Sequence, residues 1–457
     1  MHAATGEPPV AAFRNGAIGV AKRLSLHRMQ ACLRLTTYQT SPMSKVAAKR
    51  KGLNMSSSFQ MLSSRVAIFV VLLAGLSGTE LIAQIPKAGS SSPTEVPFNR
   101  DVRPDNILIN DVESPPAGKH EVHRIKFHGD TKFASGASRA VGLYQPKIES
   151  RSAEAMAAAA KKFLGSLSED LASRAVNKLE SKERSQWTNL PARPGAGGVR
   201  LSDLNEEQIE NTLDLLATML SDSGYEKLRL IMLGDDGLIQ GHRRSNGIGT
   251  EAFSIVIFGE PDAKKLWAIQ FDGHHIGLNI AIKGQQMTLG PSFIGAQPFE
   301  FKLGEQTFRP MQGERDRAFK IAQSLNDEQF REALALKQRG QLRAGPGQDG
   351  NVPKPIGISC GDLTDGQKKE LSDLLFEWVG WLPSDRAAGR MEQLKEEFDE
   401  MKFSWNGSRE DGSDVSYTIQ SPSLLIEFAY QDLGGTPQQH LHTQYRNLKN
   451  EYGKNFR

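Results

Sequence analysis

The chain has 457 residues, enough for two or three ordinary domains or one large domain with extensions. Its formal net charge of +3 is unevenly distributed: residues 1–65 hold ten Lys and Arg against one acidic residue, whereas the remainder holds 46 basic and 52 acidic residues. The body of the protein is therefore mildly acidic. Because it offers no general basic surface, we do not expect nucleic acid among its partners.

Residues 1–84 have the features of a leader that contains a signal peptide. Val66–Leu76 is an unbroken apolar run, which has the length of a signal-peptide core and is short for a membrane span of about 20 residues. A start at Met55 or Met61 would leave a normal short segment before it, and residues 1–54 would then be a gene-model artefact. We expect export to the periplasm or the cell exterior. The alternative is membrane anchoring through the uncleaved segment.

The rest of the chain divides into a tether and one large domain. Residues 85–151 are rich in Pro, Ser, Gly and charge, so we expect a loosely ordered tether. From residue 152 to 457, helical spacing alternates with short apolar or alternating runs. This mixture predicts a single α+β domain with a largely antiparallel β-sheet core and flanking helices. The expected helices are 153–171, 205–221, 326–336, 364–381 and 385–401, and the expected strands are 228–233, 253–259, 266–283, 286–289, 416–420, 424–430 and 440–446.

Three local patterns refine this division. Asn205, with Gln208 at the capping-box position, and Asn326 are the predicted caps of two helices. Residues 343–357 are dense in Gly and Pro and are predicted to form a loop. The run Gly234-Asp235-Asp236-Gly237 could recruit a cation, but its composition favours a turn between strands.

Two histidine clusters are the main candidates for a functional site. Gly273-His274-His275 is followed by Asn279, and His440 and His442 lie near the C-terminus. Successive side chains on a strand point to opposite faces, so His275 is expected to share a small, polar face with Asn279. His274 is expected on the opposite, apolar face. We therefore predict His275 as a metal ligand, and His274 and Asn279 as residues that support the ligands without binding the metal.

The second cluster completes a predicted metal site. His440 and His442 point to the same face of a strand, which puts two imidazoles side by side. With His275 they give three nitrogen ligands, enough for a divalent zinc or iron ion with a position left for water. Glu427 lies among hydrophobic residues and is a candidate fourth ligand or general base. Its alternative role is to pair with Arg446.

A set of motifs spans about residues 152–457. They are Trp187, Gly224-Tyr225, Phe258-Gly259-Glu260-Pro261, Trp267, Gly273-His274-His275, Asn279, Pro291-Ser292-Phe293, Gly295-Ala296-Gln297-Pro298, Ser421-Pro422, Glu427, His440, His442, Arg446 and Tyr452-Gly453. In these motifs the chain is similar to the exported bacterial and fungal family called domain of unknown function 3500. The resemblance implies one large domain, export and a role for the histidine segments, and it brings no established reaction. Family members usually carry acidic residues around the final Tyr-Gly, whereas Lys454 and Asn455 follow it here.

Two functions remain open from the sequence. In the first, the protein is an exported, hydrolase-like metal-dependent enzyme in which His275, His440 and His442 hold a metal that activates water. Glu427 would shuttle the proton, and Arg446 would hold an anionic group of a small-molecule or polymer substrate. In the second, it is a non-catalytic extracellular binding protein whose histidines fix loops by hydrogen bonds. Bound metal would separate the two.

Overall fold

The computed structural model describes residues 132–191, 197–239, 247–432 and 437–456. These residues belong to one compact unit, Asn99–Arg457. The expected leader and the first part of the expected tether lie outside the described residues, so these remain predictions. Among the described residues, no helix is long and apolar enough to cross a membrane.

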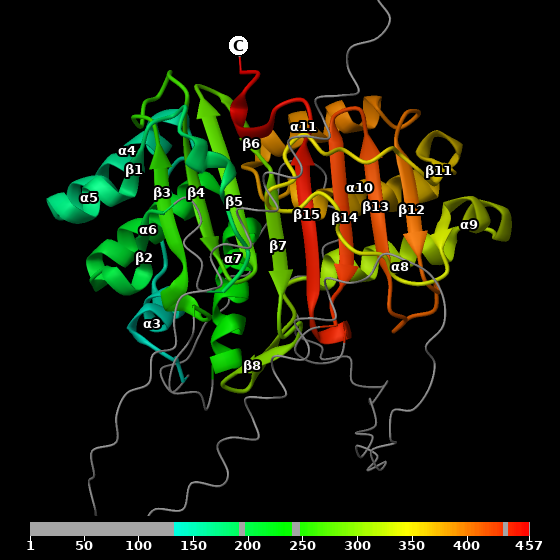
Figure 1. Ribbon diagram of the computed structural model, residues 1–457, viewed down its shortest axis with the longest axis horizontal. Coiled ribbons are helices and arrows are strands. Elements are labelled where there is room, and N and C mark those ends of the chain that lie inside the picture. Colours follow the sequence, from blue (N-terminus) through cyan, green and yellow to red (C-terminus); the bar gives the residue numbers. More distant parts are fainter. Residues whose placement is uncertain (1–131, 192–196, 240–246, 433–436, 457) are drawn as a thin grey trace, which may run out of the picture. The chain divides into compact units, whose positions relative to one another are not determined.

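A large, mainly antiparallel sheet forms the centre of this unit (Figure 1). Its strands are β1 (Val176–Asn177), β2 (Val199–Arg200), β3 (Ser254–Phe258), β4 (Trp267–Gly273), β5 (Ile276–Lys283), β6 (Gln286–Leu289), β7 (Ser292–Ala296), β10 (Leu334–Leu336), β11 (Ile358–Ser359), β12 (Lys402–Asn406), β13 (Ser416–Ser421), β14 (Leu424–Tyr430) and β15 (Leu441–Asn447). The main order is β1-β3-β4-β5-β7-β15-β14-β13-β12-β10. Only the pairs β1 with β3 and β10 with β12 are parallel among the described strands. A separate hairpin joins β8 (Phe301–Leu303) and β9 (Gln306–Phe308).

Helices cover one face of the sheet, and long loops cross the other (Figure 1). The helices are α3 (Gly136–Leu143), α4 (Ala153–Ser166), α5 (Glu169–Ala175), α6 (Glu206–Met219), α7 (Asp222–Asp236), α8 (Gln312–Ser324), α9 (Asp327–Ala333), α10 (Asp365–Val379) and α11 (Ser384–Glu396). The strand residue Thr443 accepts a hydrogen bond from Trp378 of α10 at 3.2 Å, so it points to the helical layer. Its neighbours His442 and Gln444 therefore point to the opposite face. The predicted α+β architecture is confirmed.

The structure corrects the prediction of a strand at residues 228–233, which lie within α7. All residues from Gly224 to Asp236 are buried. A helix that is buried on every side needs no polar face, so its sequence lacks the 3.6-residue periodicity that identifies a surface helix. A short apolar run of this kind is equally typical of a buried strand and of a buried helix segment.

Two further boundaries differ from the prediction. The expected strand 266–283 is a hairpin in which His274 and His275 form the turn between β4 and β5, because Gly273 pairs with Ile276. Within the expected tether, residues 132–151 include α3, whose Val141 is fully buried. The fold therefore begins before residue 152.

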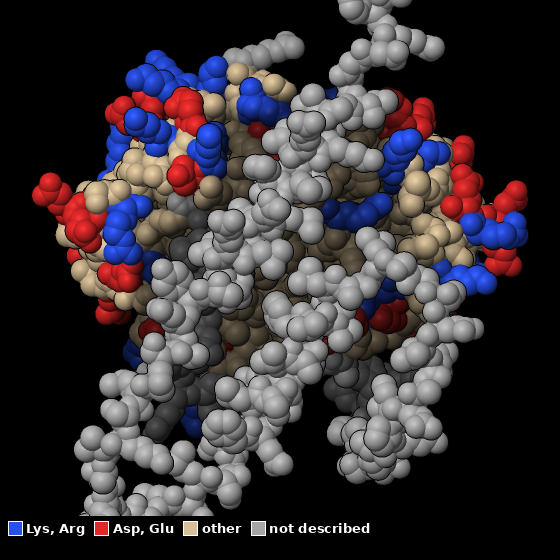
Figure 2. Space-filling view, viewed as in Figure 1, with Lys and Arg blue, Asp and Glu red and all other residues tan. Residues whose placement is uncertain are grey.

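Charged side chains of both signs are interspersed over the margins of the face that the loops cross. Figure 2 shows Lys, Arg, Asp and Glu mixed around α4 and α5 on one side and around α9 on the other. Neither margin carries charge of a single sign, in line with the nearly balanced composition of the chain body.

Candidate metal centre

The three histidines predicted as metal ligands converge at one end of the sheet. His442 lies in β15 opposite Gly295 of β7, and the backbone N–H of Gly295 donates to the carbonyl of His275 at 2.7 Å. The Nε2 atom of His440 is 3.0 Å from that of His275 and 2.9 Å from that of His442. Two nitrogen ligands of one tetrahedral zinc ion, each about 2.0–2.1 Å from the metal, lie about 3.3 Å apart. The observed spacing is close to that of a shared ion.

Gly295 leaves the space that the histidine rings occupy. A Cβ atom at this position would lie 2.8 Å from Cδ2 of His275 and 3.0 Å from Cδ2 of His442. Phe293, two residues earlier on the same face of β7, packs against His442 with the ring centroids 4.8 Å apart. On this short strand, Gly295 thus leaves space for the histidine rings, and Phe293 packs against one of them.

Burial favours the neutral form of two rings of this cluster, those of His275 and His442. His275 is 1% exposed, and burial lowers its pKa to about 4. Burial also holds the pKa of His442 well below its usual range, and the neighbouring rings of His275 and His440 add to the effect. A neutral imidazole keeps a lone pair that can bind a metal ion. At neutral pH these rings are therefore suited to a cation.

A carboxylate lies behind His275, at the end of α7. Asp235 Oδ1 is hydrogen-bonded to His274 Nδ1 and lies 3.7 Å from His275 Nδ1, which is too long for a hydrogen bond. Its Oδ2 accepts from the backbone N–H of Gly249 at 2.7 Å. Burial alone would raise the pKa of Asp235, but the contacts with His274 and His275 outweigh it, and the pKa lies below its usual value.

Sequence reasoning placed Asp235 in a turn between strands and so did not join it to the histidines. The signal was the paired aspartates in Gly234-Asp235-Asp236-Gly237, which could recruit a cation. Residues 228–233 have the pattern of a strand but belong to α7. The sequence therefore gives no sign that the end of this helix, with Asp235, lies beside the β4–β5 turn. His274 lies beside His275 in a turn and not on a strand face, and it is hydrogen-bonded to Asp235.

Glu427 holds the loop formed by residues 343–357, here called the strap. Its Oε2 atom accepts hydrogen bonds from the backbone N–H groups of Arg343 at 2.8 Å and Ala344 at 2.9 Å. The Arg343 side chain lies 3.1 Å from Oε1, and Gln444 donates to Oε2 at 3.1 Å. These donors use both carboxylate oxygens. Among the described residues Glu427 pairs with Arg343, and the alternative pairing with Arg446 is not formed.

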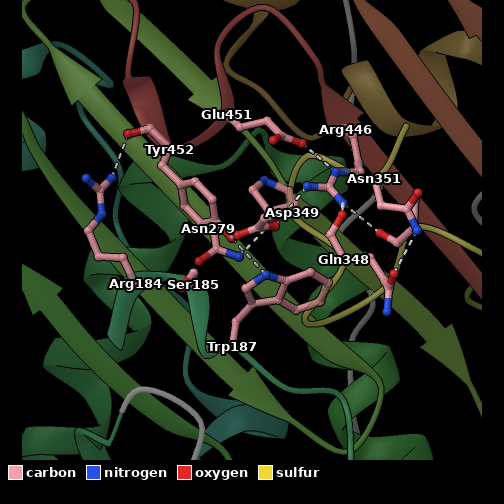
Figure 3. A network of polar contacts seen from close by, with 12 residues as sticks. Arg184, Ser185, Trp187, Asn279, Gln348, Asp349, Asn351, Arg446, Glu451 and Tyr452 are labelled. Carbon is pink, nitrogen blue, oxygen red and sulfur yellow. Dashed lines mark hydrogen bonds and ion pairs between the residues drawn. The ribbon is translucent and has the colours of Figure 1, made fainter. Parts of the chain in front are cut away.

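Arg446 is 1% exposed and holds the strap from the same sheet face (Figure 3). Its guanidinium donates to the carbonyls of Ala344 at 3.0 Å and Gln348 at 3.1 Å, and it pairs with Asp349 at 2.8 Å and with Glu451. The strap is thus fixed at several points by one buried cation.

Asn279 also belongs to this part of the sheet and not to the histidine cluster. Its side chain donates to the carbonyl of Pro291 at 2.7 Å and accepts from Gln270. In Figure 3 it lies beside Trp187 and Tyr452, which are joined by a hydrogen bond of 3.1 Å. Of the predicted site residues, the structure brings together His275, His440 and His442 and places the ring of His274 directly beside that of His275. Glu427, Arg446 and Asn279 make other contacts.

The fold and the histidine cluster define an α+β protein with one large sheet and a candidate metal centre at its end. A family model described as "Protein of unknown function (DUF3500)" matches residues 149–454, which is more than half of the chain. The chain belongs to this family, and the resemblance read from the sequence motifs is confirmed. Searches of curated proteins and of solved structures found no match.

Proposed function

We propose that this protein is a metal-dependent enzyme whose divalent ion, zinc or iron, is held by His275, His440 and His442. The convergence of three Nε2 atoms carries the proposal. A neutral ring nitrogen holds either one proton or one lone pair, and His440 Nε2 has two other Nε2 atoms about 3 Å away. It can pair well with only one of them by an N–H···N hydrogen bond. A shared cation would satisfy all three nitrogens.

Three protein ligands leave a coordination position for water, which is the usual arrangement of catalytic zinc. A metal there would lower the pKa of its bound water and supply a hydroxide at neutral pH, which supports a hydrolase-like reaction on a small-molecule or polymer substrate. The contacts of Glu427 and Arg446 favour strap anchoring over the proton-transfer and substrate-binding roles first expected. The carboxylate nearest to the three histidines is that of Asp235, whose Oδ1 atom lies 3.7 Å from Nδ1 of His275.

Zinc binding by the full chain, purified without a histidine tag and stripped with a chelator, tests the proposal. We expect His440→Ala and His442→Ala each to weaken zinc binding at the three-histidine site at least 100-fold in calorimetric titration, because each removes one of the three ligands of that site. His120→Ala, a histidine from the expected tether, is the matched control and should bind as the wild type does. Equal zinc binding by all four proteins, or none by the wild type, would favour a binding protein with structural histidines.

We also propose that the protein is exported. The support is in the sequence: Val66–Leu76 has the length of a signal-peptide core, and the segment after it is polar. N-terminal sequencing of protein recovered from its native compartment should give a mature chain that begins after this apolar run. Recovery of a chain that still carries residues 1–54 would contradict export by cleavage.

A further inference from the structure

We propose that Asp235, His274 and His275 bind a second metal ion, so that the imidazole of His275 bridges two metals. Its Nε2 atom would serve the three-histidine site, and its Nδ1 atom would serve the second site. This inference rests on the proposed function, because the two sites share His275.

The second set of ligands is buried and compact. One ligand atom from each of Asp235, His274 and His275 lies within 4.8 Å of the other two, and all three residues are buried. Two imidazole nitrogens and one carboxylate oxygen form a ligand set that suits zinc, iron and copper. The carboxylate also brings the negative charge that the first site lacks.

The Nδ1 atom of His275 is a buried polar atom that lacks a hydrogen-bond partner among the described residues. The nearest carboxylate oxygen, Asp235 Oδ1, is 3.7 Å away, longer than a hydrogen bond. Native proteins satisfy most of their buried polar atoms, so an atom without a partner requires an explanation. A cation held between Nδ1 and the carboxylate would provide the partner.

The turn between β4 and β5 explains how neighbouring residues can share one ion. On a strand, adjacent side chains point to opposite faces, which would separate His274 from His275. In the turn, His275 instead has a φ of +107°, in a region that usually favours glycine. The two rings then lie side by side, with centroids 3.8 Å apart, and both face Asp235 at the end of α7.

Loading the second site changes the protonation of His275. When metals bind both ring nitrogens, the ring gives up its N–H proton to solvent and becomes an imidazolate. The hydrogen bond between His274 Nδ1 and Asp235 is replaced by one bond from each residue to the metal. His274 stays neutral, because its Nδ1 proton leaves to solvent and its Nε2 atom takes up a proton from solvent. No oxidation or reduction is involved.

Zinc stoichiometry in the full chain separates the two sites. We expect two equivalents for the wild type and one equivalent each for Asp235→Asn, His274→Ala and His440→Ala, since each variant retains the other site. A wild type that binds one equivalent, with Asp235→Asn also binding one, would overturn the second site and leave the proposed function intact. A wild type that binds no zinc would overturn both.

Copper(II) tests the bridge itself. Two copper ions joined by one imidazolate couple their unpaired electrons, so the paramagnetic resonance signal per copper should be weaker in the doubly loaded wild type than in singly loaded Asp235→Asn. If the wild type binds two coppers with the full signal of isolated ions, His275 does not bridge them and the proposal is wrong.

Discussion

Gly295 determines how closely the two histidine-bearing segments approach. Its backbone bonds to His275 on one side and lies opposite His442 on the other. A side chain there would therefore meet both rings, and β7 cannot move away without breaking its pairing on both sides. The open position beside the two rings is a requirement of the cluster.

We expect Gly295→Ala to destabilise the fold by about 1–3 kcal/mol, the usual cost of overpacking, and to weaken zinc binding by separating the rings. Gly389→Ala is the matched control, since Gly389 is exposed on α11 and a Cβ there meets nothing within 4 Å. The control should gain about 0.5–1 kcal/mol from helix propensity. Urea denaturation and zinc titration measure both effects. Unchanged zinc affinity in Gly295→Ala would show that this glycine does not set the ring positions.

At the scale of single residues, the sequence predicted which three histidines converge but not what surrounds them. The spacing of His440 and His442 on a strand was enough to predict two neighbouring rings. The role of Gly295 depends on the register between β7 and β15, which no local pattern carries. The pairing of His274 with Asp235 depends on a turn and a helix end that residue alternation does not describe.

The strap is an element without helix or strand that is held to the sheet by buried charge. Glu427 binds its first two backbone N–H groups, and Arg446 binds two of its carbonyls. Since a loop satisfies few of its own backbone groups, these contacts supply the partners that a regular element would provide itself. The position of the strap therefore depends on both residues.

We expect Glu427→Gln to cost about 1–3 kcal/mol, because an amide leaves buried donors of the strap without an acceptor. Hydrogen exchange in residues 343–357 should become faster, and zinc stoichiometry should not change. Glu396→Gln, an exposed residue on α11, is the control and should stay within about 0.5 kcal/mol of the wild type. Loss of zinc binding in Glu427→Gln, with slow exchange retained in the strap, would instead support Glu427 as a metal ligand.

Elements with a local physical cause were the ones that the sequence predicted well. Asn205 and Gln208 form the expected reciprocal cap of α6, with hydrogen bonds of 2.9 and 3.0 Å, and Asn326 caps α9. The strap is the loop that its Gly and Pro content indicated. The buried helix α7 was missed because burial on every side removes the periodic signal, as described above.

At the scale of the whole molecule, a buried ionic cluster joins three helices behind the sheet. Lys227 of α7 lies 2.9 Å from both Glu314 of α8 and Glu377 of α10, and Arg317 lies 2.7 Å from Glu377. Glu314 is fully buried, and one of its carboxylate oxygens has no hydrogen-bond partner among the described residues. A single lysine therefore faces two carboxylates, and their ionisation is linked to the stability of the helical layer.

Burial, together with the charge of Glu377, raises the pKa of Glu314 to about 7 against the attraction of Lys227. The usual value is 4.5, so between these pH values the folded protein holds more protons at this site than the unfolded chain. Stability must then fall as pH rises through this window.

The variant Glu314→Gln has no titratable group at position 314. We therefore compare the two proteins by the difference in unfolding free energy, wild type minus Glu314→Gln. This difference should decrease between about pH 4.5 and 7 and be flat outside this range. The lowered pKa of His275 has the opposite effect on the free energy of unfolding. Between about pH 4 and 6.5 the unfolded chain holds more protons on this histidine than the folded protein does, so the contribution of His275 to stability rises with pH. Because both proteins contain His275, this contribution cancels in the difference. Urea denaturation across the pH range, in the presence of a chelator, gives the two curves. A difference that stays flat or rises with pH would mean that Lys227 keeps Glu314 ionised in the folded protein.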